Sequence, residues 1–158
     1  MSPPRFLADE MVGRLARLLR VVGCDTVYAR GVTDSEILDL ARAEDRTILT
    51  RDRQLAHRAP KALLIESPDV AEQWSSLVRA YPEVPRAPAF DRCTECNGRL
   101  APYAPGPADP RRDGVPWDRV AKGLALYRCA SCDHLYWEGS HTERIRRQLE
   151  RWSADGAA

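Results

Sequence analysis

Alternating apolar and polar positions divide the first half of the chain into short strands and amphipathic helices. Phe6-Leu7-Ala8 is a short apolar run that ends at Asp9, and apolar residues then recur at helical spacing over residues 10–22. Further strands are predicted at residues 26–28, 47–50 and 62–65. A second helix is predicted to begin at the capping box Thr33-x-x-Glu36, a short third helix to run through His57, and a fourth to be capped by Ser67-Pro68. This order predicts an α/β fold, with a layered, mainly parallel sheet and helices on both faces.

The pattern changes near residue 81, where a proline-rich segment begins. Prolines at 82, 85 and 88 block regular structure and favour a semi-rigid linker. We therefore divide the chain into an α/β domain at residues 1–80, a linker at 81–90 and a small module at 91–158. A charged helix from about Thr142 to Trp152, with Ser140 as its predicted N-cap, closes this module.

Four of the five cysteines form two Cys-x-x-Cys pairs, Cys93/Cys96 and Cys129/Cys132, with 32 residues between them. Two such pairs supply the four thiolates of a tetrahedral structural zinc site, which leaves no open position for a substrate. We expect the metal to hold the C-terminal module together and the reaction to occur elsewhere. The fifth cysteine, Cys24, lies in an apolar run and is interpreted as a small buried side chain.

Composition narrows the setting and the partners. The N-terminus does not resemble a signal peptide and no stretch is long enough to span a membrane, so we expect a cytoplasmic protein. A net charge of +1 excludes a strongly basic, histone-like binder, but arginine clusters suit contacts with phosphate. They are Arg14/Arg17/Arg20, Arg51/Arg53, Arg111/Arg112 and Arg144/Arg146/Arg147/Arg151; the alternative for each is a solvated helix face.

Two carboxylates lie just after predicted strands. Asp9 comes after the first strand and Asp52 after the third, and the carboxyl ends of parallel strands line a common crevice. Two acids in one crevice repel each other unless a cation neutralises them, and Mg²⁺ or Mn²⁺ prefers such oxygen ligands. Asp9 has one competing interpretation, as the cap of the helix that follows it.

Two further acids, Asp34 and Glu36, begin the second predicted helix. They are candidates for a third and fourth carboxylate of the acidic site. Each also has a structural interpretation, because acids in a first helical turn oppose the macrodipole and Glu36 completes the capping box with Thr33.

A series of short motifs runs along nearly the whole chain. The first half contains Phe6-Leu7-Ala8-Asp9-Glu10, Gly13-Arg14-Leu15-Ala16, Leu19-Arg20, Gly23-x-Asp25, Asp34-x-Glu36-Ile37-Leu38 and Leu49-Thr50-Arg51-Asp52-Arg53. The second half contains Arg92-Cys93-x-x-Cys96-Asn97-Gly98, Val115-Pro116, Cys129-x-x-Cys132 and Tyr136-Trp137-x-Gly139-Ser140-His141. In these motifs and their order the chain resembles the Mut7-C family of PIN-like ribonuclease domains with a C-terminal zinc ribbon.

The resemblance implies a Mg²⁺- or Mn²⁺-dependent ribonuclease whose acidic centre is formed by Asp9, Asp34, Glu36 and Asp52. It further implies that Thr50 orients Asp52. PIN enzymes often use a fourth acid downstream of this segment, and the candidates here are only Glu66 and Asp69. A site with one metal ion, held mainly by Asp9 and Asp52, therefore fits this sequence as well as a site with two.

Substrate contacts are expected on both sides of the linker. Arg14, Arg51 and Arg53 are candidate phosphate ligands. His141 matches the family pattern and is a candidate substrate-binding residue if the ribbon folds back onto the first domain. Tyr136 and Trp137 either stack on unpaired bases or form the small core of the ribbon.

A second function class stays open: an RNA- or protein-binding zinc-ribbon adaptor in which the acidic crevice is structural. A thiol oxidoreductase is disfavoured, since neither cysteine pair lies at a strand-to-helix junction of the α/β half. No nucleophilic Ser or Cys has an evident histidine partner, which disfavours covalent catalysis.

Overall fold

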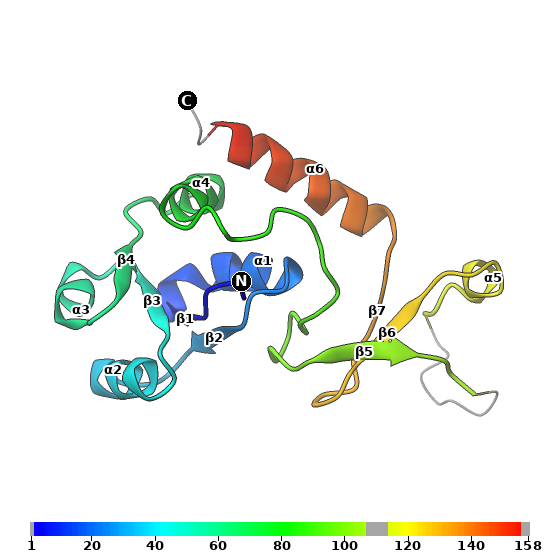
Figure 1. Cartoon of the computed structure of the whole chain (residues 1–158), viewed down its shortest axis with the longest axis horizontal. Coiled ribbons are helices and arrows are strands. Elements are labelled where there is room, and N and C mark those ends of the chain that lie inside the picture. Colours follow the sequence, from blue (N-terminus) through cyan, green and yellow to red (C-terminus); the bar gives the residue numbers. More distant parts are fainter. Residues whose placement is uncertain (1, 107–113, 156–158) are drawn as a thin grey trace.

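The computed structural model describes residues 2–106 and 114–155 and contains two separate sheets (Figure 1). The first is parallel and four-stranded, in the order β2-β1-β3-β4. Its strands are β1 (Phe6–Asp9), β2 (Thr26–Ala29), β3 (Thr47–Thr50) and β4 (Ala62–Leu64). This confirms the predicted α/β class with a mainly parallel sheet. Arg111 and Arg112, one of the predicted arginine clusters, lie outside the described residues.

Helices cover both faces of this sheet (Figure 1). They are the 3-10 turn η1 (Glu10–Val12), α1 (Gly13–Val21), α2 (Asp34–Ala43), α3 (Arg53–Arg58) and α4 (Val70–Ala80). Successive strand residues point to opposite faces, so Phe6 and Ala8 pack with α1 and α4, whereas Leu7 packs with α2 and α3. Both faces of the strands are therefore buried, as expected for a parallel sheet.

The order of the strands creates a crevice between β1 and β3. The chain runs from β1 to β2 on one side and then crosses to β3 on the other side of β1. At such a switch point the connections leave in opposite directions, which opens a crevice beyond the carboxyl ends of the two strands. Asp9 ends β1 and Asp52 follows β3 by two residues.

Two local predictions for the first domain are corrected. The helix predicted over 10–22 is split, because Glu10–Val12 forms a 3-10 turn and the α-helix begins at Gly13. A Cβ at Gly13 would lie 2.8 Å from the Oη of Tyr28, which crosses this point and donates a hydrogen bond to the Glu10 carbonyl. Asp69, rather than Ser67-Pro68, caps α4, since its carboxylate accepts a hydrogen bond from the Glu72 N–H.

The second sheet is antiparallel and three-stranded, in the order β5-β6-β7. Its strands are β5 (Leu100–Tyr103), β6 (Leu126–Cys129) and β7 (Leu135–Trp137), and a short helix α5 (Trp117–Val120) precedes β6. It lies beside the α/β domain at the amino-terminal end of α6 (Figure 1).

The final helix, α6 (Ser140–Asp155), returns from the second sheet and packs along α4 (Figure 1). Leu149 is fully buried in the same core as Trp74 and Leu77. The Trp74 indole donates a 3.0 Å hydrogen bond to the Ser153 hydroxyl. Ser140 is the first helical residue, where the sequence predicted an N-cap. Among the described residues, no helix combines the length and the apolar character needed to cross a membrane.

Candidate functional site

The four paired cysteines converge on one point. Their sulfur atoms all lie within 4.8 Å of one another, with Cys93 and Cys132 Sγ 3.5 Å apart and Cys96 and Cys129 Sγ 3.4 Å apart. Tetrahedral ligation with metal–sulfur bonds of about 2.3 Å would place sulfurs about 3.8 Å apart. The predicted cysteine cluster is therefore present, with the dimensions of a four-thiolate metal site.

The backbone around the cluster suits thiolates. The N–H groups of Ser131 and Cys132 point to the sulfur of Cys129 at 3.4 and 3.5 Å. Burial acts to raise the pKa of Cys129, but the N–H groups of Cys132 and Ser131, together with the thiols of Cys96 and Cys132, outweigh burial and lower the pKa to about 7. Gly98 allows this close packing, because a Cβ there would lie 2.8 Å from the Cys129 sulfur.

The first cysteine knuckle, residues 93–97, is bonded to the α/β domain. Arg20 of α1 donates to the carbonyls of Thr94 and Glu95 at 3.0 and 3.2 Å. The Asn97 amide accepts from the Thr26 N–H at 3.0 Å and donates to Asp25 at 2.8 Å. This contact joins residues about seventy positions apart and was not predicted, since no local pattern signals it.

Asp25 is the centre of that contact. Its carboxylate also pairs with Arg46 at 2.8 Å and with Arg92 at 3.5 Å. Burial acts to raise the pKa of Asp25, but hydrogen bonds from Arg46 and Asn97 outweigh it and lower the pKa to about 2. The side chain is therefore a carboxylate at neutral pH, and it anchors β2 to the knuckle.

The hydroxyl of Thr50 contacts both the carboxylate of Asp9 and the backbone of Asp52 beyond the ends of β1 and β3. The Thr50 Oγ1 donates to Oδ2 of Asp9 at 2.8 Å and accepts from the Asp52 N–H at 3.0 Å. Asp9 makes no side-chain cap to the following turn, which removes the competing interpretation of this residue. Thr50 contacts the backbone of Asp52 and orients Asp9 directly.

Each of these two carboxylates keeps one oxygen available. Oδ1 of Asp52 accepts from the N–H groups of Gln54 and Leu55, so Asp52 is the N-cap of α3. Within the described residues, Oδ1 of Asp9 and Oδ2 of Asp52 have no hydrogen-bond partner. Two oxygen donors of this kind are the ligand chemistry that a hard divalent cation takes.

The other two predicted acids are engaged by local structure. Glu36 accepts a 2.7 Å hydrogen bond from the Thr33 N–H, which lowers the pKa of its exposed carboxyl. Asp34 lies 3.9 Å from Arg58 of α3. The four cysteines are the one group of three or more potential metal ligands with mutually close donor atoms in the described part of the chain.

The arginines beside Asp52 differ in their surroundings. Arg53 is exposed and pairs with Glu66 at 2.9 Å. Arg51, between Thr50 and Asp52, has a buried Nε without a hydrogen-bond partner in the described residues. Such a donor favours a hydrogen-bond acceptor.

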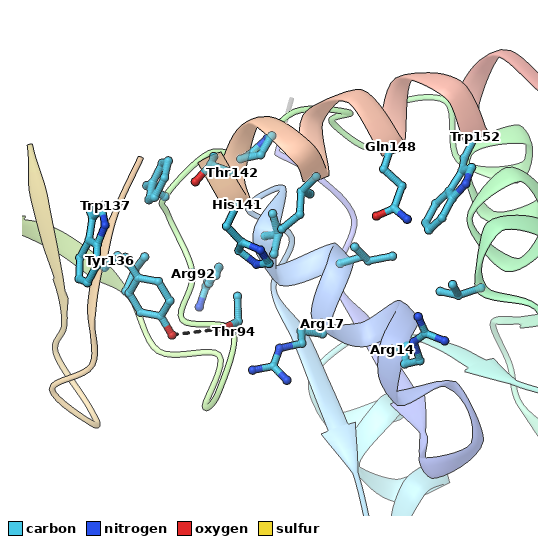
Figure 2. A pocket seen from close by; sticks show the side chains of 17 residues that line it. Arg14, Arg17, Arg92, Thr94, Tyr136, Trp137, His141, Thr142, Gln148 and Trp152 are labelled. Carbon is cyan, nitrogen blue, oxygen red and sulfur yellow. Dashed lines mark hydrogen bonds between the residues drawn. The ribbon is translucent and has the colours of Figure 1, made fainter. Parts of the chain in front are cut away.

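A groove of about 610 Å³ lies between α1, the cysteine-bearing module and α6 (Figure 2). We call it the interdomain groove; its lining includes Arg14, Arg17, Tyr136, Trp137, His141 and Trp152. Arg14 and His141 thus lie in one cavity, although the sequence assigned them to separate modules. Arg51 and Arg53 do not line it. Sequence reasoning missed Arg92 and Trp152, because their place in the groove depends on how α6 returns to the first domain.

A second hollow, of about 270 Å³, adjoins the end of β1. It is lined by the turn Glu10–Val12 and by Tyr28 and Pro68. Arg14 and Val70 line both hollows, so the second hollow adjoins the interdomain groove at Arg14.

Comparisons with known proteins give a match for most of the chain. A family model described as Mut7-C RNAse domain matches residues 4–149, which include both sheets and the first part of α6. A search of the curated proteins gives no significant match.

Proposed function

The chain belongs to the Mut7-C RNAse domain family, and from this premise we propose that it is a Mg²⁺- or Mn²⁺-dependent ribonuclease of the PIN-like type. One observation supports the proposal: Asp9 and Asp52 lie beyond neighbouring strand ends, and the Thr50 hydroxyl bonds to the Asp9 carboxylate and to the Asp52 backbone N–H. The reaction is hydrolysis of an RNA phosphodiester bond at this pair.

The donor set is consistent with a hard cation. Oδ1 of Asp9 and Oδ2 of Asp52 would hold the ion, and Asp34 and Glu36 of α2 complete the proposed acidic centre. A bound Mg²⁺ or Mn²⁺ would supply a Lewis acid that lowers the pKa of a water molecule and offsets charge on the phosphate.

The residues around the pair have distinct roles in this proposal. Thr50 fixes Asp9 through its hydroxyl, and the cap to α3 fixes Asp52, so neither carboxylate reorients when substrate binds. Arg51 supplies a hydrogen-bond donor for the scissile phosphate, and Arg53 and Arg14 neutralise the neighbouring phosphates of the RNA. Since charge accumulates on phosphate oxygens in the transition state, fixed cations there favour reaction.

We also propose that the four cysteines hold a structural Zn²⁺. The sulfur separations of 3.4 and 3.5 Å and the N–H groups directed at Cys129 support it. The metal fixes the first knuckle, which in turn binds Arg20 and Asp25. The zinc ribbon thereby supports RNA binding beside the acidic pair.

The direct test compares Asp9→Asn and Asp52→Asn with the parent on single-stranded and structured RNA, with Mg²⁺ or Mn²⁺. Asp39→Asn is a matched control, because Asp39 is an exposed acid on α2 away from the crevice. We expect both site variants to lose cleavage by more than about 100-fold, since even outer-shell partners are worth roughly 10–100-fold. If both variants cleave RNA at the parental rate, the proposed ribonuclease activity is disproved.

A second candidate, a non-catalytic RNA- or protein-binding adaptor, is favoured by one specific observation. Asp52 and Glu36 both cap helices, so part of the acidic set has a structural role. An adaptor would bind RNA or protein but would not cleave RNA, with or without Mg²⁺ or Mn²⁺. In that case Asp9→Asn and Asp52→Asn would change only the stability of the protein.

A further inference from the structure

Arg14 gives the interdomain groove a positive charge that no described residue neutralises. Arg14, Arg17 and Arg92 line the groove, and no Asp or Glu is among its described lining residues. Arg17 pairs with Glu95 and Arg92 with Asp25, but Arg14 has neither a hydrogen bond nor an ion pair within the described residues. The Nε of Arg92 is also buried without a hydrogen-bond partner there. These donors indicate an anionic occupant.

Aromatic side chains lie along the same groove. Figure 2 shows Tyr136 and Trp137 at one end and Trp152 at the other, on the same side as Arg14, with His141 and Gln148 projecting from α6 between the two ends. The Tyr136 hydroxyl is held by Cys93 and Thr94. The half-buried rings of Trp137 and Trp152 keep apolar surface in the groove, which suits stacking on bases.

Charge and aromatic surface together distinguish between forms of nucleic acid. A base stacks on a side chain only when it is unpaired, whereas a duplex offers mainly phosphates and groove edges. The groove also adjoins the hollow beside β1, because Arg14 and Val70 line both. A strand lying in it would approach the end of β1, where Asp9 lies.

We propose that the interdomain groove binds single-stranded RNA, with phosphates on Arg14 and bases against Trp137 and Trp152, and guides the strand to Asp9 and Asp52. The proposal rests on the ribonuclease function proposed above. It assigns the RNA track to a surface built jointly by α1, the zinc-ribbon module and α6.

Binding is measured without cleavage, in the full-length Asp9→Asn protein, by anisotropy of a short fluorescein-labelled RNA as a single strand and as a duplex. We expect the single strand to bind at least about tenfold more tightly, because stacking contributes roughly 5- to 100-fold per base. RNA should also quench tryptophan fluorescence, and Trp137→Leu should weaken binding and remove part of that quenching.

Arg14→Gln and Arg144→Gln form a matched pair, since both residues are exposed helical arginines and only Arg14 lines the groove. We expect Arg14→Gln to weaken binding about tenfold and to reduce the salt slope of the affinity by about 1. Arg144→Gln should change neither. Zinc content and thermal melting verify that each variant is folded.

Equal or tighter binding of the duplex, an affinity of Arg14→Gln equal to that of Arg144→Gln, or no RNA binding would overturn the groove assignment. The two proposals fail separately. RNA held in the groove by a protein that never cleaves it would refute the ribonuclease alone. If Arg14→Gln and Trp137→Leu leave the cleavage rate unchanged, the proposed RNA binding in the groove is refuted and the ribonuclease proposal stands.

Discussion

The hydroxyl of Thr50 donates a 2.8 Å hydrogen bond to the carboxylate of Asp9. Thr50 ends β3 and is fully buried, whereas Asp9 ends β1 and is partly exposed. The orientation of the Asp9 carboxylate is therefore set by the neighbouring strand, and the same hydroxyl accepts from the Asp52 backbone. The ends of β1 and β3 form one unit, and the proposed chemistry depends on it.

The first prediction concerns this unit. Thr50→Val keeps the shape and the strand preference of the side chain but removes its hydroxyl, so Asp9 loses its donor. We expect the rate of RNA cleavage to fall by roughly 10–100-fold. Initial rates at several Mg²⁺ and Mn²⁺ concentrations would show whether the loss lies in metal affinity or in turnover.

Thr50→Ser is the matched control, because it retains the hydroxyl and loses one methyl group. It should cleave within a few-fold of the parent even if its melting temperature is lower. Equal rates for the Val and Ser variants would show that the hydrogen bond to Asp9 has no part in the reaction.

The sequence predicted most of the α/β half because its signals are local. Periodicity predicted four strands and the helices around them, and the position of Asp9 and Asp52 just after two of these strands made them candidates for the acidic site. The capping box at Thr33 and Glu36 is present as predicted. The split at Gly13 was missed, because it depends on Tyr28 from another strand.

What the sequence did not predict depends on contacts between distant segments. The bond from Asn97 to Asp25 and the burial of Leu149 are tertiary contacts with no local signature. The interdomain groove is a product of both. Arg14 and His141 were candidates for substrate contact, but only the path of α6 places them in one cavity.

The second prediction is that the proposed zinc stabilises the contact between the domains. Purified protein should contain one Zn²⁺ per chain, and Cys129→Ser should lose it, because three thiolates no longer close the site. We expect a lower melting temperature and faster proteolysis around residues 93–97. Cys24→Ala is the control: Cys24 is buried in the first domain, so this variant should lose stability but keep its zinc. Full zinc content in Cys129→Ser would contradict the four-cysteine site.

The third prediction concerns acid stability. The pKa of Asp25 is about 2 in the folded protein, below the value near 3.9 of an unfolded chain. A lowered pKa stabilises the folded state above about pH 4, and this contribution disappears as the pH falls from about 4 to about 2. Asp25→Asn should therefore cost on the order of 2 kcal/mol of unfolding free energy at pH 7 and much less at pH 2.

Urea unfolding at a series of pH values measures this difference. Asp45→Asn is the control, because Asp45 also pairs with a cation, Lys61, but its side chain is 85% exposed. That variant should lose little stability at any pH. A constant difference between Asp25→Asn and the parent from pH 7 to pH 2 would contradict the assignment of the shift to Asp25.

The last prediction is that α6 belongs energetically to the α/β domain. Leu149 is fully buried among side chains of that domain, and Trp74 and Ser75 of α4 bond to the last turns of the helix. Leu149→Ala should therefore lower the free energy of unfolding by about 2–5 kcal/mol, the cost of a core cavity. Glu150→Ala, at the exposed neighbouring position, should change it by less than about 0.5 kcal/mol. Chemical unfolding followed by the fluorescence of buried Trp74, with the other three tryptophans replaced by phenylalanine in both proteins, would register the loss in the first domain itself. If that domain unfolds at the parental denaturant concentration in Leu149→Ala, α6 does not stabilise the α/β domain. The side of the interdomain groove that α6 forms would then not be fixed relative to α1.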